Sequence, residues 1–427
     1  MKAVPVTILT TETPWTKGIP TKRLIFSLCA SAVGCAFALQ FPATAIAKSK
    51  VPVETVLHSF GSGTDGQLPL VGLIDVKGTL YGTTLAGGTV GSGEGTVFSV
   101  NAKTGAETVL HSFGSGTDGY NPDASLIKVK GALYGTTEFG GTNGSGTVFS
   151  IDPATGAETV VYSFCSQQNC TDGDWPNAPM IHVKDMLYGT TYFGGTSGDG
   201  TLFSLDLKTG AETVLYSFCS QQNCADGENP WGGLIDVNGT LYGTTFTGGA
   251  NNCSGRGCGT VFSLDPSSGA ETVLYSFAGG TDGAQPEAAP LDVDGTLYGT
   301  TVAGGTYQSG LGTVYSLNLT TGAEAVLHQF GGTNDGISPN SRLIDVKGKL
   351  YSTTVGGGNS NHAGTVFSID PTTGAEAVIY DFCSQQNCTD GEYPQGGVIN
   401  KGAELYGTTQ VGGSYNNYGT VFALTKF

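Results

Sequence analysis

The 427-residue chain carries 35 Asp and Glu against 18 Lys and Arg, which gives it a formal net charge of −17. A surface this acidic repels phosphate backbones and anionic membranes, so the composition argues against nucleic-acid binding. The 69 glycines, together with the absence of a sustained 3.6-residue apolar period, predict an all-β protein with tight turns and almost no helix.

The N-terminal segment has the pattern of a secretory signal. Lys22 and Arg23 precede a long apolar stretch, which ends in the small-residue exit at residues 43–47. We therefore predict a signal peptide at 1–47 and a single mature domain at 48–427 with no transmembrane helix. The mature protein is expected to be exported, whether to the periplasm, the cell surface or the medium.

The remaining chain repeats with a period of about 54 residues. Each unit has four short runs rich in Thr, Val, Tyr and Phe, as at 125–129, 132–137, 146–151 and 158–164. Seven such units predict a seven-bladed β-propeller of four-stranded antiparallel blades. The clearest marker is Leu-Tyr-Gly-Thr-Thr (Leu-Tyr-Ser-Thr-Thr in the sixth copy), which begins at Leu80, Leu133, Leu187, Leu241, Leu297, Leu350 and Leu405.

The two ends of the repeat region complement each other. A Glu-Thr-Val-Leu run lies within residues 53–60, before the first pentapeptide, whereas the last unit stops after 419–423 without a fourth strand. We therefore predict that 53–60 complete the last blade. This pairing closes the ring and leaves no open sheet edge.

These motifs resemble a known repeat family. The succession Leu-Tyr-Gly-Thr-Thr, Gly-Gly, Gly-Thr-Val-Phe-Ser and Pro-x-Thr-Gly-Ala-Glu-Thr-Val-Leu is similar to the GloVer tandem repeat of exported bacterial proteins, over about residues 53–427. More distantly the chain resembles kelch and galactose-oxidase-like propellers. The resemblance implies a propeller and an exported protein. It implies no activity, because the family has no agreed catalytic motif.

Eight cysteines of the repeat region form four Cys-x4-Cys pairs in separate units. A structural zinc site needs four ligands in one place, so local disulfides in an oxidising compartment are the favoured interpretation. The predicted disulfides are Cys165–Cys170, Cys219–Cys224, Cys253–Cys258 and Cys383–Cys388.

No catalytic, cofactor-binding or metal-binding motif is present, and we predict no cofactor. His58, His111 and His328 occupy a repeat position that holds Tyr in the other copies, which indicates a packing position. Asp-Gly-x-x-Pro recurs in every unit. We interpret it as a turn in preference to a calcium site, because Asp hydrogen-bonds its own turn and Gly accepts positive φ.

Function is expected where the repeats differ, on the face formed by the second-to-third-strand loops and the loops that join one blade to the next. Two of these loops carry the two tryptophans of the predicted mature chain, and a third is similar. Aromatic rings beside carboxylates and amides suit saccharides, since rings stack on sugar C–H faces and polar groups bond the hydroxyls. The candidate ligand-binding residues are Asp174, Trp175, Glu228, Asn229, Trp231, Glu392 and Tyr393.

These observations favour a monomeric exported binding or interaction module for an extracellular glycan or a protein ligand. One alternative is a polysaccharide-active hydrolase or lyase, with Asp174, Glu228 or Glu392 as acid/base residues. Another is a passive envelope protein. Convergence of these three carboxylates at the centre of the ring would favour the enzyme.

Overall fold

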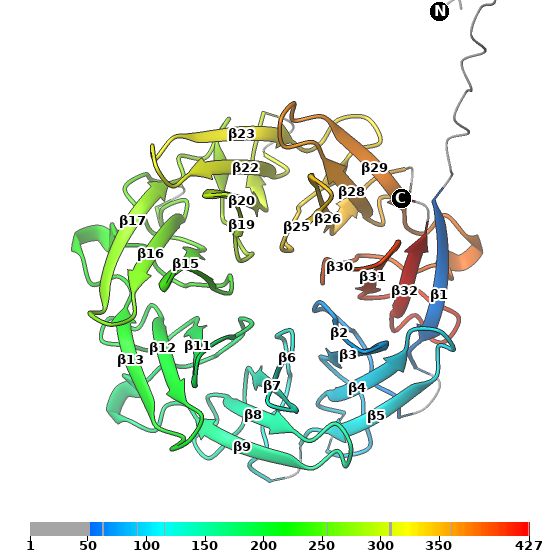
Figure 1. Ribbon diagram of the computed structural model, residues 1–427, viewed down its shortest axis with the longest axis horizontal. Coiled ribbons are helices and arrows are strands. Elements are labelled where there is room, and N and C mark those ends of the chain that lie inside the picture. Colours follow the sequence, from blue (N-terminus) through cyan, green and yellow to red (C-terminus); the bar gives the residue numbers. More distant parts are fainter. Residues whose placement is uncertain are drawn as a thin grey trace, which may run out of the picture. The chain divides into compact units, whose positions relative to one another are not determined.

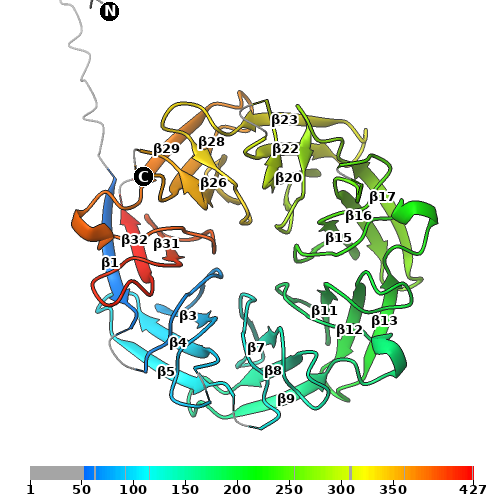
Figure 2. The same ribbon diagram turned by 180° about the vertical axis from the view of Figure 1, so that it is seen from behind.

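The computed structural model describes residues 52–427 except 62–63, 92, 115, 254, 307–309, 360 and 426. The predicted signal peptide lies outside the described residues. Within them, seven four-stranded antiparallel sheets stand around a common axis, as both faces of the ring show (Figures 1 and 2). The predicted all-β seven-bladed propeller is thus confirmed.

Each blade runs outward from a short inner strand. The first three blades are β2 (Ile74–Val76), β3 (Thr79–Thr84), β4 (Thr96–Asn101) and β5 (Glu107–Ser112); β6 (Ile127–Val129), β7 (Ala132–Thr137), β8 (Thr147–Ile151) and β9 (Glu158–Ser163); and β10 (Ile181–Val183), β11 (Met186–Thr191), β12 (Thr201–Asp206) and β13 (Glu212–Ser217). The next three are β14 (Ile235–Val237), β15 (Thr240–Thr245), β16 (Thr260–Asp265) and β17 (Ala270–Ser276); β19 (Leu291–Val293), β20 (Thr296–Thr301), β22 (Thr313–Asn318) and β23 (Glu324–Gln329); and β25 (Ile344–Val346), β26 (Lys349–Thr354), β28 (Thr365–Ile369) and β29 (Glu376–Asp381).

The seventh blade is assembled from both ends of the repeat region. It contains β30 (Val398–Lys401), β31 (Glu404–Thr409), β32 (Thr420–Thr425) and β1 (Val53–Ser59). β1 pairs antiparallel with β32, and Figure 1 shows the two strands side by side where the chain's blue and red ends meet. The predicted closure of the ring by residues 53–60 is confirmed.

Smaller elements lie in the loops. Two-residue strand pairs join β18 (Gly283–Ala284) to β21 (Ala303–Gly304) and β24 (Gly336–Ile337) to β27 (Gly356–Gly357). Short 3-10 turns form at η1 (Gln168–Cys170), η2 (Gln222–Cys224) and η3 (Gln386–Cys388). Each of these turns ends in a disulfide-bonded cysteine. The four predicted disulfides are all present.

The pentapeptide glycine is required by packing inside the blade. A Cβ added at Gly82 would lie 2.7 Å from the ring of Phe98 on the neighbouring strand β4. A second element of the motif, its last threonine, bonds the same strand through the hydroxyl pair Thr84 Oγ1 and Thr96 Oγ1, 2.8 Å apart. The glycine and the last threonine of the pentapeptide therefore determine how the second strand of a blade packs on the third.

Neighbouring blades are joined by buried aromatic pairs. A phenylalanine that follows the outer strand of one blade packs edge-on against an aromatic ring of the next blade, with ring centroids 5.0–5.1 Å apart. In the described part of the chain these pairs are Phe60–Phe98, Phe113–Phe149, Phe164–Phe203, Phe218–Phe262, Phe277–Tyr315, Phe330–Phe367 and Phe382–Phe422. Because such T-shaped pairs add to area burial, this contact is a main source of stability between blades.

A carboxyl cluster also recurs at the blade junctions. At one junction the Tyr162 hydroxyl lies 2.8 Å from Asp172 Oδ2 and 3.5 Å from Glu212 Oε2 of the next blade. Burial and the charge of Asp172 raise the pKa of Glu212 to about 7. His58 occupies the tyrosine position at another junction, 3.2 Å from Asp65. The His/Tyr position and the Asp of the Asp-Gly turn thus bind each other.

Candidate functional site

A cavity of about 710 Å³ lies along the axis of the ring and is lined by all seven blades. Much of its wall is aliphatic, since six of the seven inner strands contribute one Ile or Leu each at an equivalent repeat position. These side chains are Ile74, Ile127, Ile181, Leu291, Ile344 and Ile399. In a pocket with a wall of this kind, specificity depends on the few polar groups beside it.

The polar groups come mainly from one repeat position, the residue directly after the recurring proline of Asp-Gly-x-x-Pro. Seven residues occupy this post-proline position, and all of them line the cavity. They are Leu70, Asp123, Asn177, Trp231, Glu287, Asn340 and Gln395. The position varies in charge, size and polarity while the turn before it stays constant. It therefore has the character of a recognition position set on a rigid scaffold.

Two asparagines at the post-proline position have unused hydrogen-bonding capacity. Asn177 is 4% exposed, and neither atom of its amide has a partner among the described residues. Asn340 donates to Gln395 Oε1 at 3.4 Å, but its own Oδ1 is unpaired in that set. Since buried polar atoms are nearly always paired in native proteins, these amides indicate a bound polar molecule or water.

Acidic groups of the cavity are shifted towards their neutral forms. Burial raises the pKa of Asp123 well above its usual value, and Glu138 adds to the rise by its charge and by a hydrogen bond. Burial also raises the pKa of Glu138. Both carboxyl groups are therefore shifted in the direction of the neutral form. Burial alone raises the pKa of Glu287 to about 7.

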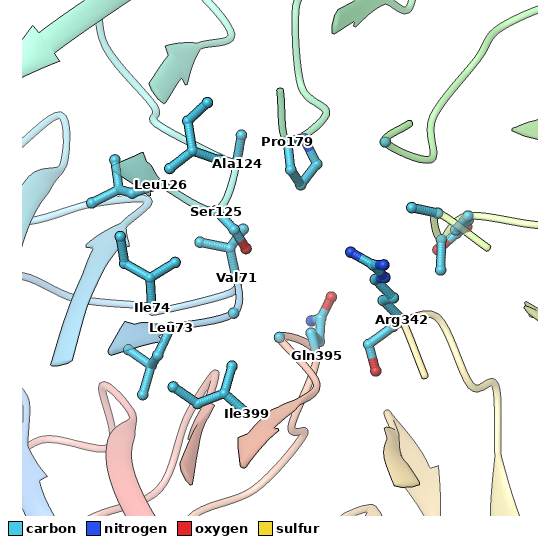
Figure 3. Close-up of a pocket in the computed structure, with 18 of the residues that line it drawn as sticks. Val71, Leu73, Ile74, Ala124, Ser125, Leu126, Pro179, Arg342, Gln395 and Ile399 are labelled. Carbon is cyan, nitrogen blue, oxygen red and sulfur yellow. The ribbon is translucent and has the colours of Figure 1, made fainter. Parts of the chain in front are cut away.

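Among the described residues, one Lys or Arg side chain lines the cavity. Figure 3 shows Arg342 and Gln395 pointing into it from neighbouring blades. Arg342 is exposed to solvent within the cavity, and no acidic side chain shifts the pKa of its guanidinium. Arg342 lies three residues after the recurring proline, a position occupied in other blades by Gly72, Ser125 and Pro179.

An aromatic cluster leads from the outer loops to the cavity. Trp175 contacts Phe139, Phe193 and Tyr192, with ring centroids 5.4–5.6 Å apart. Tyr192 in turn packs edge-on against Trp231 at 5.1 Å. The run extends further to Tyr120 and Phe246 at its two ends. Trp231 is thus both the inner member of the aromatic cluster and part of the cavity wall.

The structure separates the residues that the sequence suggested as a site. Trp231 is the one member of that set that lines the cavity. The acid/base candidates instead form isolated bridges in three blade-to-blade loops, where Asp174 pairs with Phe193, Glu228 with Thr247 and Glu392 with Val411. None of the three lines the central cavity, so they do not converge there.

The other candidates hold the loops in shape. Asn229 donates from Nδ2 to the carbonyl of Tyr192 and accepts from Thr247 Oγ1. Tyr393, on the last of these loops, donates its backbone N–H to the carbonyl of Ala363 in the preceding blade. Both residues have positive φ, of 55° each. Their loops are therefore tied to the neighbouring blade by backbone geometry and hydrogen bonds.

Groups of His, Cys, Asp and Glu gather at three places in the described residues, and none is a convincing metal site. Two of the groups contain cysteines that are already paired in disulfides, next to Glu228 and next to Glu392. A disulfide sulfur is not the thiolate that binds metals. The third group, His328, Asp335 and Glu376, is one copy of the recurring junction cluster.

The sequence matches the family model described as the Gloeobacter/Verrucomicrobia repeat at residues 43–256 and 254–426. The chain belongs to this repeat family. No curated protein matches the sequence. Among the described residues, no helix is long and apolar enough to cross a membrane.

Three solved structures are similar to this repeat-family chain at low sequence identity. An oligogalacturonate lyase in complex with manganese is 14% identical, with 82% of this chain and 86% of that chain covered and a TM-score of 0.49. The extracellular domain of a one component system from B. thetaiotaomicron is 10% identical, with 87% and 40% covered and a TM-score of 0.55. A nidogen/laminin complex is 13% identical, with 67% and 90% covered and a TM-score of 0.41.

Proposed function

We propose that this chain is an exported binding module that holds an oligosaccharide in the central cavity. The observation that carries the proposal is the position of Trp231, which joins the aromatic cluster to a cavity with unpaired amides. An indole face stacks on the C–H face of a pyranose ring. Sugar hydroxyls then bond the partly exposed polar side chains of the post-proline position, such as Glu287 and Gln395.

Export is supported by the four disulfides, because such bonds persist in oxidising compartments. It is supported also by the pattern of residues 1–47. A rigid ring with a fixed central cavity suits this role, since preorganised sites lose little conformational entropy when they bind a ligand.

A polysaccharide-active enzyme is the second candidate. The observation in its favour is the Asp123–Glu138 carboxyl pair, of which Asp123 lines the cavity. A carboxyl group whose pKa is raised by burial and by a neighbouring carboxyl group is suited to act as a general acid. Incubation of the protein with a polysaccharide tests this candidate. New reducing ends or unsaturated products that disappear in Asp123→Asn would establish catalysis. A polysaccharide left unchanged would favour binding as the function.

The test is a panel of oligosaccharides presented to the purified protein, followed by calorimetry on those that bind. Removal of the Trp231 side chain loses its buried stacking surface, so Trp231→Ala is expected to weaken binding by about 5- to 150-fold, or about 1–3 kcal/mol. Tyr415→Ala serves as control, because Tyr415 is 53% exposed and lies outside the cavity lining. Binding that survives Trp231→Ala unchanged, or a panel without any ligand, would refute the proposal.

A further inference from the structure

Arg342 is the one Lys or Arg among the described residues that line the cavity. Its guanidinium forms no hydrogen bond or ion pair with any residue of the described chain. The protein around it carries a formal net charge of −17. The Arg342 side chain is exposed to solvent within the cavity, so its guanidinium donors are free to bind an anionic group of a ligand.

The backbone that carries Arg342 is held by a hydroxyl cluster specific to this blade. Ser352 replaces the glycine found in the other six copies of the pentapeptide. It is 0% exposed and donates from Oγ to the carbonyl oxygens of Arg342 (3.0 Å) and Ser341 (3.2 Å). The Ser341 hydroxyl in turn lies 3.0 Å from Ser352 Oγ and 2.8 Å from Thr353 Oγ1. The single departure from the pentapeptide therefore lies beneath the one Lys or Arg side chain that lines the cavity among the described residues.

We propose that Arg342 binds the carboxylate of an acidic sugar, so that the ligand is a uronate-containing oligosaccharide, and that Ser352 is the positioning residue for Arg342. This inference rests on the proposed function above. The planar guanidinium offers a pair of parallel N–H donors that match a carboxylate. A sugar sulfate is the other monoanion with this chemistry, and the experiment separates the two.

The remaining charges of the cavity favour one negative group over several. Asp123, Glu287 and Asp345 also line it, so a ligand with dense charge would be repelled. Asp345 already accepts the backbone N–H of Gly348 at 2.8 Å. A monoanionic sugar ring satisfies this arrangement, because its carboxylate faces Arg342 while its hydroxyls donate to the acidic side chains.

The experiment compares three versions of one oligosaccharide by calorimetry: the uronate form, the same chain with its carboxyl groups reduced to alcohols, and a sulfated neutral chain. Wild-type protein is expected to bind the uronate form about tenfold or more tightly than the reduced form, as for hydrogen bonds to charged groups. Arg342→Gln is expected to remove this preference, so that the uronate and reduced forms bind with similar affinity. Lys128→Gln makes the same change in net charge outside the cavity and keeps the preference.

Ser352→Gly restores the common pentapeptide and tests the positioning role. It is expected to reduce the preference for the uronate form several-fold while affinity for the reduced form stays constant, which a merely structural role would not produce. Arg342→Lys, which keeps the charge, is the second variant should Arg342→Gln fail to fold. It is expected to keep only part of the preference, because Lys lacks the planar pair of donors.

Three results would overturn the inference while leaving saccharide binding intact: equal affinity for the uronate and reduced forms, an undiminished preference in Arg342→Gln, or binding of the sulfated form alone. Binding of none of the forms by wild-type protein would overturn the proposed function together with this inference.

Discussion

Closure of the ring by β1 predicts that two equivalent phenylalanines, one at the closing junction and one at an internal junction, contribute equally to the free energy of unfolding. Phe60 follows β1 and packs on Phe98 of the first blade with ring centroids 5.0 Å apart, and Phe113 packs on Phe149 in the same way at an internal junction. Both phenylalanines are 0% exposed. If the closing junction is as well packed as an internal one, Phe60→Ala and Phe113→Ala should cost the same free energy of unfolding.

The expected magnitude follows from the loss of a fully buried ring. Phe→Ala in a packed core costs about 3–5 kcal/mol. With an unfolding entropy of about 2.1 cal/mol/K per residue over roughly 375 residues, this lowers Tm by about 4–6 °C. Differential scanning calorimetry of the two variants beside wild-type protein measures the shift directly.

Removal of residues 48–60 is the stronger form of the same perturbation. It deletes β1 and Phe60 together and exposes the edge of β32, so cooperativity or solubility should fall as well as Tm. A Tm for Phe60→Ala within error of wild type, alongside a lowered Tm for Phe113→Ala, would show that the ring is not held closed by β1.

Further predictions concern acid–base behaviour, disulfides and the aromatic cluster. The pKa of Glu212 is about 7 in the folded protein and 4.5 in the unfolded chain, so between these pH values the folded state binds one proton more than the unfolded state. Tm should therefore fall as pH rises from 5 to 8. In Glu212→Gln the fall should be smaller, because this carboxyl group is absent. Burial lowers the pKa of His58. Below pH 6.5 the unfolded chain therefore binds more protons at this residue than the folded protein, so His58 makes Tm rise with pH in that range. Non-reducing peptide mapping should recover the Cys253–Cys258 pair, and reduction should increase hydrogen exchange in its loop while the strands stay protected; free thiols would contradict this. Trp175→Ala should lower Tm by several degrees because three aromatic partners lose their contact, and an unchanged Tm would show that these contacts add little.

Much of the fold follows from the sequence because its determinants are local and repeated. The pentapeptide marks the second strand, since Gly82 and Thr84 meet the third strand within the same blade. Closure was predictable because 53–60 supply the strand that the last unit lacks. Each disulfide closes a five-residue separation, so its pairing could be read from spacing alone.

The cavity was harder to predict because its lining comes from seven segments about 54 residues apart. The residues before and after the recurring proline lie in different environments. Trp175 precedes its proline and packs within the aromatic cluster, whereas Trp231 follows its proline and lines the central cavity. Comparison of the seven repeats in the sequence shows that the post-proline position varies. This variability is the sequence signal that could have identified the residues lining the cavity. The sequence shows that Ser352 and Arg342 both depart from the repeat in the same blade. That the two residues contact each other is known only from the hydrogen bond between Ser352 Oγ and the Arg342 carbonyl in the structure.

The central claim, that an oligosaccharide binds in the cavity against Trp231, is tested most directly by tryptophan fluorescence in a Trp175→Phe protein. Of the three tryptophans in the sequence, Trp15 lies in the predicted signal peptide, so Trp231 then reports alone in the mature chain. Titration with an oligosaccharide that binds by calorimetry is predicted to shift the emission and to protect the indole from acrylamide quenching. Calorimetric binding without any change in the emission or quenching of Trp231 would contradict the account.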